Sequence, residues 1–323
     1  MNDKKKKIKI IFAGTPHFAA CHLETLITSK HIILGILTQP DRPNKRGNIT
    51  TYTPVKTLAK KYKIPVFQPI QIQNTTDCTE ILNMKADIMI VVAYGVILPK
   101  FLLNAFPMGC INVHASLLPH WRGAAPIQWA ILKGEKKTGI TIIQMEEKLD
   151  AGKILYTVPC NILNKDTTNS LLHKLSRIGS QAILIVLKKI NNKSIIPIIQ
   201  DENKVTYATK LSKLMGKINF FTSAKVIERM IRAFHPWPGT YIEIKNIKIK
   251  IYQAEIIKSN LIYQIGQIIK INKYGIQIQT KKNILNIQKI QIPGKKIHSV
   301  CKFIQTKNKL FQVNQILTTE SIK

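Results

Sequence analysis

The sequence lacks the features of a membrane protein and of a secreted protein held together by disulfides. No window approaches the roughly 18 to 20 uninterrupted apolar residues that a membrane span needs, and the lysines at 4–7 are followed only by a short strand-like run. The five cysteines are scattered and form no CxxC pair, which favours reduced thiols. We therefore expect a soluble protein of the cytoplasm.

Several cofactor motifs are absent as well. There is no GxxxxGK[ST] sequence for a nucleoside triphosphate and no GxSxG nucleophile elbow. The segment FAGTPHFAA turns at a glycine after the first predicted strand but is not GxGxxG, so a nicotinamide cofactor is unsupported. His17, Cys21 and His22 are of metal-ligand types, yet no second pair follows at a suitable spacing, and we expect no metal site.

Acidic residues are scarce, and the net charge is strongly positive. Only 17 Asp and Glu stand against 49 Lys and Arg, which gives a formal net charge of +32. Residues 1–200 carry 27 basic and 11 acidic side chains, whereas the shorter segment 201–323 carries 22 and 6. This charge suits a polyanionic partner such as nucleic acid. The alternative is compositional drift in an AT-biased genome, which enriches lysine without a function.

The first half of the chain alternates between strand and helix patterns. Apolar runs predict strands at 7–14, 31–39, 86–95, 109–115 and 138–145, and helical periodicity predicts helices at 18–28, 125–133 and 168–189. Continuous apolar runs of this kind are typical of central parallel strands, which are buried on both faces. The fold class that follows is α/β, with a Rossmann-like, mostly parallel sheet.

The character of the sequence changes after residue 190. Residues 191–206 are polar, contain a proline and resemble a linker. Beyond them, one helical stretch at 224–234 precedes short runs that alternate isoleucine with polar residues, as small antiparallel barrels do. We therefore predict an N-terminal domain at 1–190, a linker at 191–206 and a smaller, basic, OB-like β-barrel domain at 207–323.

Polar side chains gather where predicted strands of the first domain end. Asn112 and His114 alternate along a strand, so both point to the same side, and an amide beside an imidazole suits an oxyanion that develops on a carbonyl. Asp150 lies in a turn after the following strand, and we expect it at the same strand-end crevice, where a carboxylate can orient His114 and collect a proton. The alternative is structural: a turn-capping Asn, a surface His and an Asp in an Asx-turn.

Motifs around these residues resemble one known family. The chain contains, in the order typical of the 10-formyltetrahydrofolate-dependent formyltransferase family, the segments FAGTPHFAA, TQPDRP, PVKTLA, VVAYGVILP, GCINVHASLLPHWRGAAPIQWAI, GITIIQMEEKLDAGKIL, TYATKLSK and RAFHPWPGTY. The elements TQPDRP, WRGAAPIQ and RAFHPWP resemble the members of that family that act on tRNA. The resemblance implies formyl transfer from 10-formyltetrahydrofolate to the methionine of initiator methionyl-tRNA, by a monomer that uses no metal.

The resemblance also implies roles for individual residues. Asn112 and protonated His114 would stabilise the oxyanion of the tetrahedral intermediate, while Asp150 would pair with His114 and help remove the amine proton. Contacts with the folate are implied for Tyr94, Gly95, Ile97, Leu98, Ser116, Leu117, Leu118 and Pro119. Contacts with tRNA are implied for Arg42, Lys45 and Arg46 in the loop after TQPDRP, and for Lys295 and Lys296 near the carboxyl end.

Two other functions remain open at the level of the sequence. A related enzyme that formylates a small amine, or that hydrolyses the folate, would use the same Asn, His and Asp but would not need a dense basic second domain. A nucleic-acid-binding protein with an idle ancestral site is the third possibility. The retention of Asn112, His114 and Asp150 together counts against it.

Overall fold

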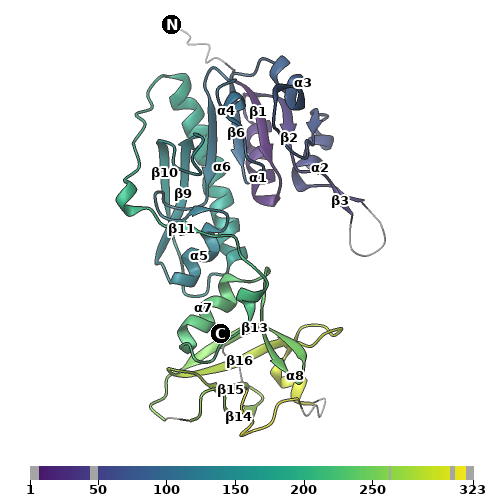
Figure 1. The fold of residues 1–323 in the computed structure, drawn as a ribbon, viewed down its shortest axis with the longest axis vertical. Helices are drawn as coiled ribbons and strands as arrows, with labels where there is room; N and C mark the ends of the chain where they lie inside the picture. Colours follow the sequence, from purple (N-terminus) through teal and green to yellow (C-terminus); the bar gives the residue numbers. More distant parts are fainter. Residues whose placement is uncertain (1–6, 44–49, 262, 306–309, 318–323) are drawn as a thin grey trace. The chain divides into compact units, whose positions relative to one another are not determined.

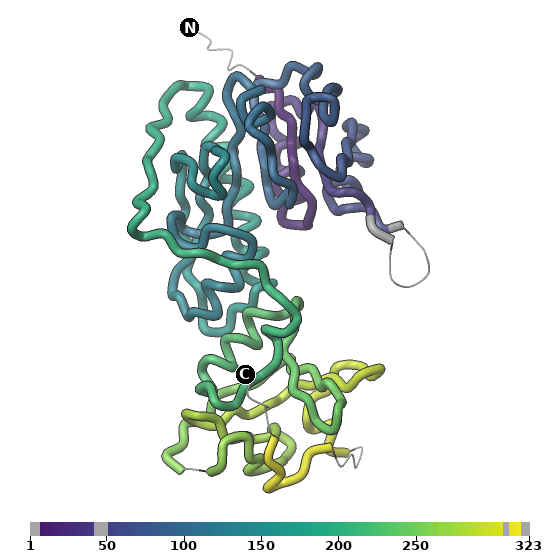
Figure 2. The backbone as a smooth tube through the Cα atoms, in the orientation of Figure 1, coloured from purple at the N-terminus to yellow at the C-terminus, as the bar shows by residue number. Residues whose placement is uncertain are grey.

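The computed structural model describes residues 7–43, 50–261, 263–305 and 310–317. The chain divides into two compact units, drawn as a ribbon in Figure 1 and as a tube in Figure 2. The first unit contains residues 1–126, 137–161 and 172–208, and the second contains residues 127–136, 162–171 and 209–323. The division into an N-terminal domain, a linker and a C-terminal domain at residues 190 and 207 stays a prediction.

A seven-stranded sheet forms the centre of the first unit (Figure 1). Its order is β10-β9-β7-β6-β1-β2-β5; the pairs from β7 to β5 are parallel, whereas β9 runs antiparallel to both β7 and β10. The strands are β1 (Lys9–Gly14), β2 (Ile32–Leu37), β5 (Val66–Phe67), β6 (Ile88–Val92), β7 (Cys110–His114), β9 (Lys137–Gln144) and β10 (Ile154–Asn161). The central strands β1 and β6 are buried along almost their whole length, as their unbroken apolar sequences require.

Helices pack on the sheet of the first unit. At Gly179 of α6 an added Cβ would lie 2.4 Å from Nε2 of His22 in α1, so glycine lets these two helices approach closely. Ile11 of β1, Ile81 of α3 and Leu102 of α4 pack in one hydrophobic core cluster. The helices of the chain up to residue 191 are α1 (His17–Ile27), α2 (Pro54–Lys61), α3 (Thr79–Asn83), α4 (Lys100–Leu103), α5 (Pro126–Lys133) and α6 (Thr168–Asn191).

The register of the parallel strands brings their carboxyl ends to one edge of the sheet. Gly14 of β1 pairs with Val92 of β6, and Val91 pairs with Asn112 of β7. The segments that follow these three strands therefore leave the sheet side by side. Such an edge is where α/β proteins place their ligand sites.

His22 is a buried imidazole of the first unit. Its Nδ1 donates to the carbonyl oxygen of Phe18 at 2.7 Å, and its Nε2 has no hydrogen-bond partner among the described residues. Burial lowers the pKa of His22 from 6.5 to about 4, although the hydrogen bond to Phe18 acts in the opposite direction. The folded protein therefore holds this ring in its neutral form.

We expect the first unit to lose stability as the pH falls from about 7 to 5. The unfolded chain binds a proton at His22 near pH 6.5, whereas the folded chain resists protonation until about pH 4. The free energy of unfolding should therefore drop by on the order of 2 kcal/mol over this window. Urea unfolding at the two pH values measures the drop, and the variant His22→Leu, which has no titrating ring, should show a smaller one. Equal losses in the two proteins would contradict this assignment.

An antiparallel sheet forms the core of the second unit. Its path is β12-β13-β16-β15-β14, and β17 pairs with β16. The inward isoleucines Ile249 and Ile251 of β13 pack in one core with Ile227 and Ile231 of the amphipathic helix α7. The elements are α7 (Ala224–Ala233), β12 (Thr240–Ile244), β13 (Ile247–Ile257), β14 (Ile268–Asn272), β15 (Gly275–Gln279), β16 (Ile284–Gln291), β17 (His298–Ser299) and α8 (Val300–Gln305).

The predicted order of a mostly parallel α/β sheet followed by an antiparallel β domain is confirmed. Closure of the second sheet into an OB-like barrel stays a prediction. In the part of the chain that the structure describes, no helix has both the length and the apolar character that a bilayer crossing demands.

Candidate active site

Asn112, His114 and Asp150 lie together at the end of β7. The amide Nδ2 of Asn112 donates to Oδ1 of Asp150 at 3.3 Å, and Nδ1 of His114 lies 3.5 Å from Oδ2 of the same carboxylate. The side chains of His114 and Asp150 are only 6% and 9% exposed. The structure thus brings the three candidate catalytic residues together, with both Asn112 and His114 in contact with the carboxylate of Asp150.

Asp150 reaches this group by a different route from the one expected. The strand before it, β9, is antiparallel, so its carboxyl end lies beside the start of β7, where Gln144 pairs with Ile111. The segment after β9 then has to return along the sheet to reach Asn112 and His114. Its return is tight: an added Cβ at Gly152 would lie 1.7 Å from the carbonyl oxygen of Gln144, so only glycine fits there.

The loop after β7 fixes the other side of the imidazole. Nε2 of His114 lies 2.9 Å from the carbonyl oxygen of Trp121, so both ring nitrogens face oxygen atoms. Within this loop, the hydroxyl of Ser116 donates to the carbonyl of His120, and the hydroxyl of Thr141 donates to the carbonyl of Ser116. These bonds hold the loop in one conformation beside the site.

A second set of contacts holds Asp150 through its carboxylate and through its backbone carbonyl. The backbone N–H of Gly123 donates to Oδ2 of Asp150 at 2.8 Å. The amide of Gln200 donates to the carbonyl oxygen of Asp150 at 2.8 Å and accepts two hydrogen bonds from Arg122. Arg122 is fully buried and also donates to Glu202 at 2.7 Å. The sequence pattern did not identify Gln200, because it lies in a polar stretch that resembles a linker.

Glu202 is the exposed member of this set of contacts. Its carboxylate accepts from Arg122 and from Lys148, which belongs to the same turn as Asp150. These two hydrogen bonds lower the pKa of Glu202 from 4.5 to about 2. The carboxylate therefore stays ionised, and the buried guanidinium keeps a charged partner.

The arrangement suits an acyl-type transfer. An amide donor and an imidazole can stabilise an oxyanion, and a carboxylate beside them can accept a proton. Among the described residues, no group of three or more His, Cys, Asp or Glu side chains is placed to hold a metal ion. The chemistry that this geometry supports is general acid–base and electrostatic catalysis at a carbonyl group.

The predicted folate residues divide into buried and exposed positions. Tyr94, Leu98, Ser116 and Leu118 are buried, whereas Ile97 is 89% exposed and Gly95 adopts a positive φ of 81° on the surface. Leu117 and Pro119 are half-buried. Burial raises the pKa of the Tyr94 hydroxyl to about 12, and this oxygen has no hydrogen-bond partner among the described residues. Tyr94 is therefore part of the core of the first unit, and contact of the folate with any of these eight residues stays a prediction.

The predicted tRNA residues are described only in part. Lys45 and Arg46 lie outside the described residues, and of Arg42 only the backbone is described, in the two-residue strand β3 (Arg42–Pro43), which pairs with β4 (Thr50–Thr51). Lys295 and Lys296 are exposed between β16 and β17 in the second unit. Their contact with tRNA stays a prediction.

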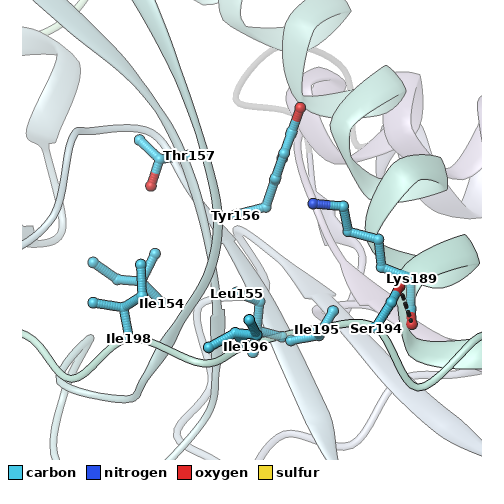
Figure 3. Close-up of a pocket in the computed structure, with 9 residues that line it drawn as sticks. All are labelled: Ile154, Leu155, Tyr156, Thr157, Lys189, Ser194, Ile195, Ile196 and Ile198. Carbon is cyan, nitrogen blue, oxygen red and sulfur yellow. Dashed lines mark hydrogen bonds between the residues drawn. The ribbon is translucent and has the colours of Figure 1, made fainter.

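A separate cavity of about 310 Å³ lies beside the edge strand β10 in the first unit (Figure 3). Figure 3 shows Ile154 of β10 and Ile198 of the segment after α6 together on one side of it, with Lys189 and Tyr156 on the other. The ammonium of Lys189 lies 5.1 Å from the centre of the Tyr156 ring. None of the three candidate catalytic residues lines this cavity.

Comparison with known proteins matches almost the whole chain. Residues 6–187 match the formyl transferase family, and residues 210–308 match the formyl transferase C-terminal domain. A methionyl-tRNA formyltransferase of Buchnera aphidicola subsp. Schizaphis graminum (strain Sg) is 49% identical over 313 residues, which cover 97% of this chain and 100% of that protein.

Solved structures of other enzymes share the fold. An N-formyltransferase from Helicobacter canadensis, in complex with folinic acid and dTDP-3-aminofucose, has a TM-score of 0.65 at 19% identity, over 87% of this chain and 99% of that chain. HypX from Aquifex aeolicus, in complex with tetrahydrofolic acid, has a TM-score of 0.65 at 15% identity; the match covers 98% of this chain and 50% of HypX. At these identities the likeness is one of fold alone.

Proposed function

The chain belongs to the formyl transferase family, and we propose that it transfers the formyl group of 10-formyltetrahydrofolate to the α-amino group of methionine on initiator methionyl-tRNA. The observation that carries the proposal is the contact of Asp150 with both Asn112 and His114. The 49% identity to a methionyl-tRNA formyltransferase over 97% of the chain supports the choice of acceptor. Such an enzyme acts in the cytoplasm, and we propose that it works as a monomer without a metal ion.

In the proposed reaction, the neutral amine of methionine attacks the formyl carbon. A nitrogen–carbon bond forms, and the carbonyl electron pair moves to oxygen as an oxyanion. Asn112 donates to this oxygen, because its NH₂ group carries two hydrogens and only one is needed for Asp150. The ring of His114, when it carries two protons, adds positive charge beside the oxyanion.

Asp150 is the proton acceptor in the proposed reaction. The amine loses a proton to Asp150 through water as the tetrahedral intermediate forms. The oxyanion then collapses, the bond from the formyl carbon to N10 of the folate breaks, and N10 takes the proton from Asp150 through water, which returns the carboxylate to its ionised form. The products are formylmethionyl-tRNA and tetrahydrofolate, and no redox step is involved.

We propose that the two substrates occupy the residues that the resemblance implies. The pterin lies along the segment that follows β6, against the exposed Gly95 and Ile97, with Tyr94 as a buried wall. Arg42, Lys45 and Arg46, together with the exposed pair Lys295 and Lys296, contact the tRNA backbone. The net charge of +32 supports a polyanionic acceptor over a small amine.

Binding of tRNA should weaken steeply with salt. If the protein neutralises four or more phosphates, the affinity should fall by about 10²-fold between about 50 and 200 mM salt, because bound lysines and arginines release counterions from the nucleic acid. Replacing both Lys295 and Lys296 with alanine should reduce the slope of log K against log salt by about 1 to 2. Fluorescence anisotropy with labelled initiator tRNA measures both slopes.

A lysine outside the proposed contacts provides the control for this titration. The exposed Lys30 of the first unit, changed to alanine, should leave the slope unchanged. An affinity that does not depend on salt would contradict tRNA as the partner. It would direct the search for the acceptor to small amines.

A further inference from the structure

Gln200 joins the segment after α6 to the turn that carries Asp150. Figure 2 shows this segment, residues 192–208, running along the outside of the first unit. Its last two residues form β11 (Tyr207–Ala208), which pairs with β8 (Arg122–Gly123). Gln200 is 5% exposed, and its side-chain Nε2 donates to the carbonyl oxygens of Asp150 and Gly152, both at 2.8 Å. Its Oε1 accepts from Nε and Nη2 of Arg122 at 3.1 and 2.9 Å. Both hydrogens and both lone pairs of the amide are therefore used.

The turn at Asp150 needs support from outside. Asp150 has a φ of 51°, in the left-handed region, which costs a non-glycine residue about 1 to 2 kcal/mol. Within the turn, the N–H of Ala151 donates to the carbonyl of Lys148 at a long 3.3 Å. Gln200 bonds the carbonyl oxygens of Asp150 and Gly152, so it fixes the orientation of the peptide groups 150–151 and 152–153.

The short strand β8 also holds the carboxylate of Asp150. Arg122 and Gly123 form β8, which pairs in parallel with β11 (Tyr207–Ala208). Gly123 bonds the carboxylate of Asp150 directly, and its neighbour Arg122 holds Gln200, which bonds the carbonyl of Asp150. Strand β8 therefore holds both the carboxylate of Asp150, directly, and its backbone carbonyl, through Gln200.

We propose that Gln200 is a positioning residue of the formyl-transfer site, which holds the carboxylate of Asp150 against Asn112 and His114 by fixing the turn 149–152. The inference rests on the proposed function. It gives the segment 191–206, which the sequence predicts to be a linker, a part in catalysis. The role requires an amide, because the position needs two donors toward carbonyl oxygens and an acceptor toward Arg122.

Two substitutions at this position separate positioning from packing. Gln200→Met keeps the volume and removes all four hydrogen bonds, and it should lower kcat by about 10- to 10²-fold while the KM values for tRNA and folate change by less than about 3-fold. Gln200→Glu keeps an acceptor for Arg122 but places an oxygen against two carbonyl groups, so it should lose as much. Wild-type kcat in Gln200→Glu would show that pairing with Arg122 is the only role and would overturn the proposal.

Gln279→Met provides the matched control. Gln279 is also buried, at 6% exposure, and donates to the carbonyl of Thr280 in the second unit. Its replacement should leave kcat unchanged. An equal loss in this control would assign the effect of Gln200→Met to general damage rather than to the position of Asp150.

A double-mutant cycle shows whether Gln200 acts through Asp150. In the background of Asp150→Asn, the further change Gln200→Met should lower kcat by less than about 2-fold, because the group that it positions no longer accepts the proton. Losses that multiply in the double variant would mean that Gln200 acts independently of Asp150, and would overturn the proposal.

Hydrogen exchange provides a measurement that does not depend on activity. In Gln200→Met the amides of Gly123 and Ala151 should exchange faster, while the amides of β1 and β6 keep their protection. If the wild-type protein does not formylate methionyl-tRNA, the proposed function fails, yet this measurement still decides whether Gln200 holds Asp150. Unchanged exchange at both amides would overturn the positioning role.

Discussion

Replacing Asp150 with asparagine lowers kcat for formyl transfer by about 10²- to 10⁴-fold, the range expected for the loss of a group that takes up a proton in the transition state. The asparagine keeps the shape of the side chain, and its Oδ1 can still accept from the N–H of Gly123. The fold and the affinity for folate should therefore be preserved. Single-turnover transfer of labelled formyl groups, together with thermal unfolding, measures both effects.

A matched control for this substitution is Glu80→Gln, which removes an exposed carboxylate of α3 in the same unit. Its kcat should equal that of the wild type. If Asp150→Asn retained the wild-type rate, the carboxylate would have no part in proton transfer, and the assignment of the site would be wrong. If the rate and the unfolding temperature fell together, the role of Asp150 would be structural.

Replacing Asn112 with alanine should lower kcat by about 10²- to 10³-fold, because the change removes one donor to the developing oxyanion. The KM for methionyl-tRNA should change little, since the oxyanion exists only on the way to the product. The variant also loses a 3.3 Å hydrogen bond to Asp150, which is long for such a bond and contributes little to stability. Steady-state kinetics with charged initiator tRNA measures the split between kcat and KM.

The exposed amide of Asn104, at the end of α4, provides the comparison for Asn112. Asn104→Ala should behave like the wild type in both parameters. A rise in the KM of Asn112→Ala with an unchanged kcat would place this residue in substrate binding and not in stabilisation of the transition state.

The strands of the parallel sheet could be predicted from the sequence because the hydrophobic pattern of each strand is local. The unbroken apolar runs that became β1 and β6 are typical of the centre of a parallel sheet, and the alternation of Asn112 and His114 placed both at one site. The antiparallel direction of β9 was not predicted. A single strand gives no signal for its direction, which depends on the length and path of the connections around it.

The residues that hold the turn of Asp150 in place were not predicted from the sequence. Gln200 and Glu202 lie in a polar, proline-containing stretch, where hydropathy predicts exposure, yet Gln200 is buried by its four hydrogen bonds. Arg122 is buried for the same reason, since Gln200 and Glu202 satisfy its charge and most of its donors. Contacts between residues about 80 positions apart depend on the tertiary fold, which local patterns do not encode.

The decisive experiment is transfer of a labelled formyl group from 10-formyltetrahydrofolate, with three acceptors in parallel: methionine-charged initiator tRNA, methionine-charged elongator tRNA, and an amino sugar nucleotide. We expect labelled formylmethionine on the initiator tRNA, little on the elongator tRNA and none on the sugar, with the label lost in Asp150→Asn. Label on the small amine alone, or release of formate without transfer to tRNA, would contradict the proposed function.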